Sequence, residues 1–149
     1  MPHTIELHRV LSAPPERVFR AFTEADALAQ WLPPHGFTAT VHALDLREGG
    51  RFRMSFRNFS TGDVVSFGGE YLHIAAPQLL RYTDVFDDPA LPGTIEVEVR
   101  LSAVPSGTEL QVRQSGIPEV IARDGCYLGW QQSLNALARL VEPDMRPPG

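Results

Sequence analysis

The hydrophobic period changes along the chain, and this change constrains the fold more than any other feature of the sequence. Apolar and polar residues alternate through most of the middle of the chain, most clearly at residues 94–101 (TIEVEVRL). Such alternation is typical of a strand with one face in a core and the other in water. The breaks between strand-like segments are short and contain turn residues, such as Gly49-Gly50, which favours antiparallel hairpins. The predicted strands of this region are residues 37–46, 51–58, 63–74, 79–86, 94–101 and 108–117.

The two ends of the chain have other patterns. Residues 4–11 partly alternate and predict one further strand. Two short helices are expected after it, one that begins at Pro14 or Pro15 and one from about residue 24 to residue 31. Residues 118–142 predict a long helix, because apolar side chains recur there at intervals of three and four. The apolar stripe of this helix consists of Val120, Tyr127, Trp130, Leu134, Leu137 and Val141.

This order of elements predicts an α+β fold, in which a seven-stranded antiparallel sheet curls around the C-terminal helix. A helix covers a strip about 10 Å wide, whereas seven strands about 4.8 Å apart span far more. We therefore expect a cavity of at least about 300 Å³ between sheet and helix, mostly apolar and with one polar end. Residues 1–142 are expected to form a single domain, followed by a loose Pro-rich tail at residues 143–149.

Composition excludes several classes of protein. All thirteen basic residues are arginine, so the chain has no lysine for Schiff-base chemistry. The formal net charge of −5 argues against a nucleic-acid partner. The single cysteine, Cys126, cannot form an internal disulfide or a cysteine-rich zinc site. The sequence has no run of about twenty apolar residues and no targeting segment, so we expect no membrane span and a cytoplasmic location.

No sequence motif predicts a cofactor or a metal. The five histidines do not have the spacing of a zinc site, and no nucleophile elbow or phosphate-binding loop is present. His73 is expected at a surface or a sheet edge, unless a bulge turns it toward the cavity. Gly68-Gly69 lies inside a predicted strand and predicts a bulge or a sharp bend.

Asp84 is the acid with the most unusual expected environment. If Tyr82 and Phe86 of the same strand face inward, Asp84 does too, because alternate residues share a face. An inward carboxyl needs a partner, or its pKa rises. The candidate partners are Arg113, Gln114 and Asp124. The carboxyl then belongs either to a polar cluster that closes one end of the fold or to a functional site.

The candidate ligand-binding residues follow from this geometry. Aromatic side chains at strand spacing normally form core, but in a curled sheet some core positions are also cavity walls. Tyr127 is added to the set because it lies one helical turn after Asp124 and belongs to the apolar stripe of the long helix. The candidate set is Phe52, Met54, Phe56, Tyr71, Tyr82, Asp84, Tyr127 and Trp130.

Several motifs, in this order, resemble the START-like (SRPBCC) proteins. The opening motifs are APPERVFRAF at residues 13–22 and LAQWL at residues 28–32. The later motifs are DLREGGRFR at 45–53, GEY at 69–71, LRYT at 80–83, GTEL at 107–110 and GW at 129–130. The most similar branch is the one named after activators of the heat-shock protein 90 ATPase. The resemblance covers nearly the whole chain and implies the helix-grip fold, in agreement with the order of elements.

Three functions are compatible with the sequence and this resemblance. The first is a pocket protein that binds an apolar small molecule, which needs few polar groups in the cavity. The second is a cyclase-like enzyme that uses a cavity acid or tyrosine for proton transfer, as some relatives do. The third is a protein-interaction module that contacts a chaperone, which needs an exposed apolar patch instead of a deep pocket. A homodimer formed through an edge strand or a loop patch is also expected.

Overall fold

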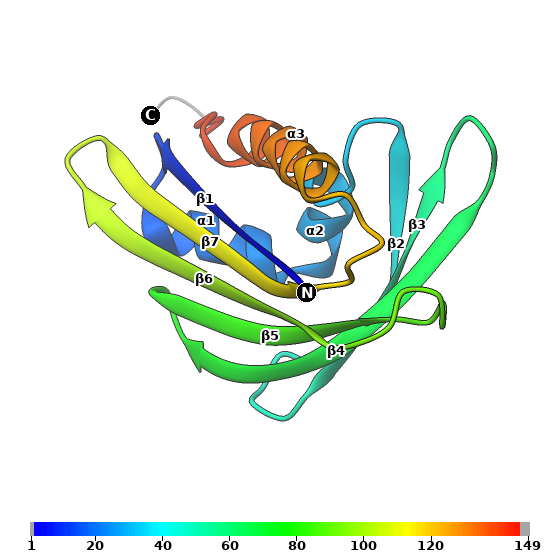
Figure 1. Ribbon diagram of the computed structural model, residues 1–149. Coiled ribbons are helices and arrows are strands. Elements are labelled where there is room, and N and C mark those ends of the chain that lie inside the picture. Colours follow the sequence, from blue (N-terminus) through cyan, green and yellow to red (C-terminus); the bar gives the residue numbers. More distant parts are fainter. Residues whose placement is uncertain (1, 147–149) are drawn as a thin grey trace.

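The computed structural model describes residues 2–146. In this range the chain folds into seven strands and three helices, in the predicted order (Figure 1). The elements are β1 (His3–Leu11), α1 (Pro15–Thr23), α2 (Ala25–Trp31), β2 (Phe37–Leu44), β3 (Arg51–Asn58), β4 (Val64–Ala75), β5 (Leu79–Phe86), β6 (Ile95–Val104), β7 (Gly107–Ile117) and α3 (Arg123–Val141). The α+β helix-grip architecture predicted from the sequence is confirmed.

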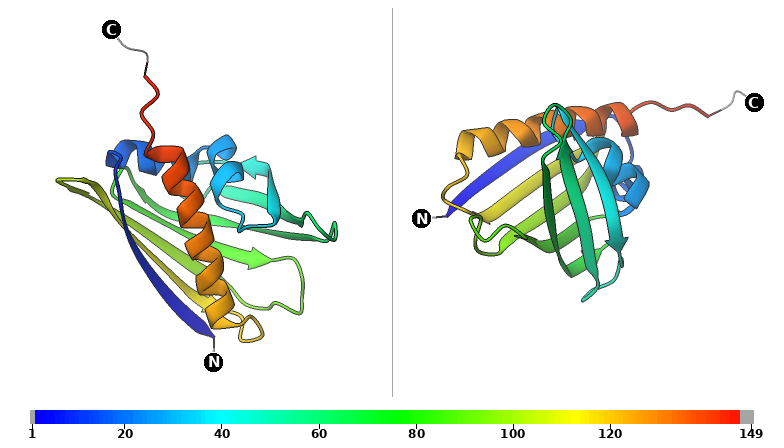
Figure 2. Two further views of the ribbon diagram at one scale, coloured as in Figure 1. Left: turned by 90° about the horizontal axis from the view of Figure 1, so that it is seen from above. Right: turned by 90° about the vertical axis from the view of Figure 1, so that its right-hand side faces the viewer.

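The seven strands form one antiparallel sheet in the order β1-β7-β6-β5-β4-β3-β2. The strands β1 and β2 therefore lie at opposite edges, although only α1 and α2 separate them in the sequence. The sheet is strongly curved, and all three helices lie on its concave side (Figure 1). The helix α3 lies across the open side of this curve (Figure 2). An edge-strand homodimer stays a prediction, and β1 and β2 are the strands available for it.

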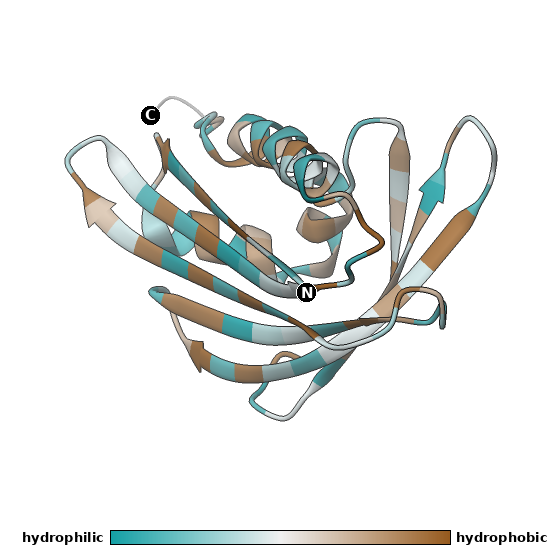
Figure 3. Cartoon of the chain, viewed as in Figure 1, coloured by the Kyte–Doolittle hydropathy of each residue, from teal (hydrophilic) through white to brown (hydrophobic). Residues whose placement is uncertain are grey.

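The alternation in the sequence separates the two faces of the sheet. In β6, Ile95, Val97, Val99 and Leu101 are buried on the concave side, and the residues between them are more exposed. The hydropathy bands along β6 and β7 show the same alternation (Figure 3). The outer face carries exposed ion pairs, which contribute only about 0–1 kcal/mol each. Two of these pairs are Arg53–Asp87 and Arg81–Glu96, each at 2.5 Å.

The core joins the short helices to α3 and the sheet. Trp31 of α2 is completely buried, its Nε1 donates a 2.8 Å hydrogen bond to the carbonyl oxygen of Ala21, and its ring packs edge-on against Phe22. Leu134 and Leu137 of α3 are also completely buried. None of the helices within residues 2–146 combines the length and the apolar character that a membrane span requires.

The predicted beginning of the last helix is wrong. Residues 118–121 form a turn, in which the N–H of Ile121 donates to the carbonyl oxygen of Pro118, and α3 begins only at Arg123. This turn places Val120 outside the helix with 72% of its surface exposed, and Tyr127 is 43% exposed. The rest of the predicted stripe, Trp130, Leu134, Leu137 and Val141, is buried as expected.

Gly68 and Gly69 in β4 allow the backbones of the neighbouring strands to approach closely, and they do not form the predicted bulge. The pairing of β3 with β4 is regular at Gly68 and Gly69, and the irregularity in β4 lies instead between Tyr71 and His73. A Cβ atom at Gly69 would lie 1.8 Å from the carbonyl oxygen of Thr83, so only glycine fits there. The bulge expected at Gly68-Gly69 is therefore wrong in position, while the alternative of a bend there stays a prediction.

The predicted Pro-rich tail at residues 143–149 is described only in part. Residues 143–146 form no helix or strand, and Arg146 and Asp144 form an ion pair with a 2.6 Å contact. Residues 147–149 lie outside the described part of the chain, so the looseness of the tail stays a prediction.

Candidate functional site

A cavity of about 270 Å³ lies between the concave face of the sheet and the helices. It is slightly smaller than the 300 Å³ minimum predicted, because aromatic side chains fill part of the space. Its walls come mainly from β3, β4 and β5 on the sheet side and from α2 and the first half of α3 on the other. Seven of the eight predicted site residues line it: Phe52, Met54, Phe56, Tyr71, Tyr82, Asp84 and Trp130.

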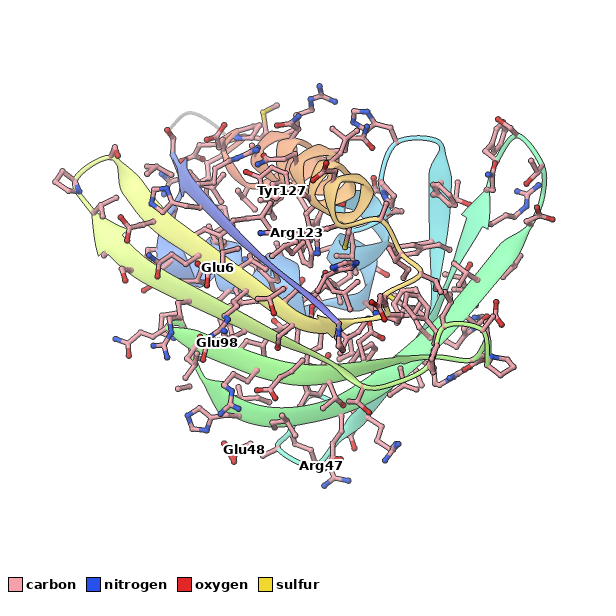
Figure 4. The ribbon with its side chains drawn as sticks, viewed as in Figure 1. Glu6, Arg47, Glu48, Glu98, Arg123 and Tyr127 are labelled. Atoms are coloured by element: carbon pink, nitrogen blue, oxygen red, sulfur yellow. The ribbon has the colours of Figure 1, made fainter. Side chains whose placement is uncertain are left out.

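Tyr127 is the predicted site residue that lies outside this cavity. Its side chain is exposed near the beginning of α3, where Figure 4 also labels Arg123. It lines a separate, polar depression together with Glu6 and Arg113. The placement of Tyr127 in the pocket is therefore wrong, because the face of α3 that borders the cavity runs through Cys126 and Trp130.

Three aromatic rings from adjacent strands form one wall of the cavity. Phe52 of β3 lies 5.6 Å from Tyr71 of β4 and 5.5 Å from Tyr82 of β5, measured between ring centroids. The two tyrosines are direct partners in the β4–β5 register, with centroids 6.2 Å apart. Burial raises the pKa of Tyr71 to about 12 and raises that of Tyr82 further. Both phenols are therefore neutral at ordinary pH and can donate hydrogen bonds.

Asp84 lines the same cavity, as its strand position predicts. Among the residues that line it, Asp84 is the one with a charged side chain. Its Oδ1 atom is buried and has no hydrogen-bond partner within residues 2–146. Burial raises the pKa of this carboxyl to about 7, and a backbone hydrogen bond from Val85 offsets only part of that effect. Asp84 can therefore gain or lose a proton near neutral pH.

The predicted partners of Asp84 are engaged or located elsewhere. Gln114 lines the cavity, but its Oε1 accepts hydrogen bonds from Trp130 Nε1 at 2.9 Å and from Cys126 Sγ at 3.4 Å. Arg113 lies outside the cavity and faces Glu6, with 3.7 Å between the charged atoms. Asp124 is exposed in the first turn of α3. Arg113 and Asp124 therefore do not belong to a polar cluster around Asp84, and the prediction is wrong for these two residues.

No metal-binding group of three or more His, Cys, Asp or Glu side chains occurs in the described range 2–146. His73 is exposed, and its Nδ1 lies 3.3 Å from an oxygen of Glu48. The expectation that His73 lies away from the cavity is confirmed.

Two glycines of α3 also border the cavity, and sequence reasoning missed this role. Gly125 and Gly129 are one helical turn apart, and both line the space beneath the helix. A Cβ atom at Gly129 would meet only Pro34, at an ordinary 3.8 Å, and one at Gly125 would meet only Ala122, also at 3.8 Å. Close packing of Trp130 therefore does not require a glycine at position 129. The glycines instead enlarge the cavity.

We expect Gly129→Ala to stabilise the protein, because glycine in a helix interior is about 1 kcal/mol less favourable than alanine. The free energy of unfolding, measured by urea denaturation, should rise by about that amount. Gly125→Ala, in the first turn of α3, should have a smaller effect of the same sign. A decrease at Gly129 would show that its missing Cβ is needed for packing.

Comparisons with known proteins agree with this fold. The family described as Activator of Hsp90 ATPase homolog 1-like protein matches residues 12–142. A Chromobacterium violaceum protein of solved structure is 53% identical, with a TM-score of 0.95, over 97% of this chain and 100% of that chain. No curated protein matches the chain.

Two further solved structures are more distant. An AHSA1-like protein from Aeromonas hydrophila is 25% identical, with a TM-score of 0.75, over 94% of this chain and 92% of that one. A Rhodobacter sphaeroides protein is 23% identical and has the same fold, with a TM-score of 0.82, over 92% of this chain and 90% of that one. The resemblance noted in the sequence is confirmed, and the chain belongs to the family of Activator of Hsp90 ATPase homolog 1-like proteins.

Proposed function

We propose that this protein binds an apolar small molecule in the cavity between the sheet and α3. The observation that carries the proposal is the cavity itself, with a volume of about 270 Å³ and walls made largely of aromatic and aliphatic side chains. Ligand pockets typically combine such apolar walls with a few polar groups that orient the ligand. The glycines of α3 support the same function, since they keep open a space that a more stable helix would partly fill.

The uncharged, solvent-sensitive dye prodan tests this proposal. We expect saturable binding with a blue shift of its emission, because the dye leaves water for an apolar site. In the wild-type protein the ring centroids of Phe56 and Phe67 lie 4.9 Å apart on the cavity wall. Phe56→Arg should abolish binding, because it places a charge on this wall beside Phe67. Phe59→Arg is the matched control, because Phe59 is 68% exposed and lies outside the cavity.

The outcomes of this experiment are distinct. Circular dichroism should show that both variants keep the fold. Equal binding by wild type and Phe56→Arg would place the dye outside the cavity. A wild-type protein that shows no saturable binding would contradict the proposal.

Proton transfer, as in a cyclase-like enzyme, is a second candidate function. Asp84 supports it, because a carboxyl with a pKa of about 7 can act as acid or base at neutral pH. The test is exchange of the α-hydrogens of an apolar methyl ketone for deuterium, followed by proton NMR in D₂O. Exchange that wild type accelerates and Asp84→Asn does not would support catalysis. Equal rates with and without the protein would count against it.

A chaperone-contacting interaction module is the remaining alternative. Its support is the exposed apolar surface around the beginning of α3, where Val120 is 72% and Leu128 is 58% exposed. This function would become the leading one if the cavity failed to bind apolar probes. The homodimer and the cytoplasmic location expected from the sequence remain parts of the proposal.

A further inference from the structure

We propose that the ligand is a hydrophobic amine, whose apolar body fills the cavity and whose protonated nitrogen pairs with the carboxylate of Asp84. This inference rests on the proposed binding function and specifies the chemistry of the ligand.

The first argument is that one oxygen of the Asp84 carboxyl lacks a partner. Its Oδ1 is buried without a hydrogen bond from residues 2–146, and the cavity wall contains no arginine or histidine. Two other polar atoms of the cavity wall already have partners, since Gln114 Oε1 accepts from Trp130 and Ser133 Oγ donates to the carbonyl oxygen of Leu32 at 2.6 Å. A buried carboxylate is unfavourable unless a donor reaches it, and here the ligand can supply that donor.

The second argument is the aromatic surface beside this carboxylate. Tyr82 and Asp84 are two residues apart on β5, so their side chains share the concave face. Tyr82 belongs to the ring cluster with Phe52 and Tyr71. Aromatic faces attract organic cations, and a neighbouring carboxylate adds to that attraction. The same arrangement repels fatty acids and other anions, because it would place two negative charges together in an apolar cavity.

The third argument is a dependence on pH that distinguishes an amine from a neutral ligand. An ammonium group binds the ionised carboxylate, so amine affinity should rise with pH until Asp84 is fully ionised. The other titratable groups on the cavity wall are Tyr71, Tyr82 and Cys126, and burial raises the pKa of each. The wall residues from α1, α2, β3, β6 and β7 do not titrate. Asp84 is therefore the group on this wall that controls binding around neutral pH.

The test compares three molecules with one skeleton: phenylbutylamine, phenylbutanol and phenylbutyrate. Binding is measured by isothermal titration calorimetry at about pH 5.5 and about pH 8, where the alkylamine is protonated. At the higher pH we expect the amine to bind at least about ten-fold more tightly than the alcohol, and the butyrate to bind most weakly. Between the two pH values the amine affinity should rise about ten-fold or more, while the alcohol affinity changes little.

Variants separate this inference from the proposed function. Asp84→Asn should remove the preference for the amine and its pH dependence while the alcohol still binds. Asp63→Asn is the matched control, since Asp63 is an exposed carboxyl outside the cavity. Equal affinities for amine and alcohol, or a preference that survives in Asp84→Asn, would overturn the amine assignment alone. If neither these molecules nor prodan bound, the pocket function itself would fail.

Discussion

Replacement of Trp31 by alanine is expected to lower the free energy of unfolding by about 3–5 kcal/mol. Trp31 is completely buried where α2 packs against α1 and the core, so truncation leaves a large cavity. It also removes the hydrogen bond to the carbonyl oxygen of Ala21 and the edge-on contact with Phe22, whose centroid lies 4.7 Å away. These losses add to the transfer free energy of the indole ring.

Urea denaturation followed by circular dichroism measures this effect. Trp31→Phe should have a smaller effect, because it keeps much of the ring volume and loses the N–H donor. Phe59→Ala is the surface control and should change stability by less than about 0.5 kcal/mol, since Phe59 is largely exposed. A loss below about 1 kcal/mol for Trp31→Ala would show that the helices repack around the gap.

Asp84→Asn is expected to stabilise the protein at alkaline pH and to flatten its stability profile. The folded pKa of Asp84 is about 7, against an ordinary value of 3.8. Between these values the folded state binds more protons than the unfolded state, so stability falls as pH rises and becomes constant above the folded pKa. From about pH 5 to about pH 8 the wild type should lose at most about 2–3 kcal/mol through this group.

Denaturation of wild type and Asp84→Asn across this pH range measures the difference. The advantage of the variant should grow with pH and then level off above the folded pKa of Asp84. Asp63→Asn should follow the wild-type profile, because this carboxyl is exposed. Parallel profiles for wild type and Asp84→Asn would mean that the Asp84 carboxyl is solvated in the folded state.

The sheet and most of the cavity wall could be predicted because strand alternation fixes which face a side chain occupies. The alternation along β3 and β5 predicts Phe52, Tyr82 and Asp84 on the concave side, and all three line the cavity. The inward position of the Asp84 carboxyl also follows from the alternation, since an acid between two inward aromatic residues must face inward with them.

The errors at α3 arise because the side that a residue of a helix faces depends on where the helix begins. Pro118 suits a first helical turn, but the chain makes a separate turn there and delays α3 to Arg123. That delay exposes Val120, and the path of α3 over the sheet leaves Tyr127 outside the cavity. The role of Gly129 was missed for another reason, because a sequence does not show what a Cβ atom would meet.

The strand order has a consequence for how the chain folds. The first strand, β1, pairs with β7 along its whole length, from His3 opposite Ile117 to Leu11 opposite Thr108. These partners are about a hundred residues apart, and such distant pairing is characteristic of slow-folding topologies. During synthesis from the N-terminus, β1 leaves the ribosome first and has no partner strand until β7 has emerged. The strand β1 therefore completes its edge of the sheet only after the other six strands have been made.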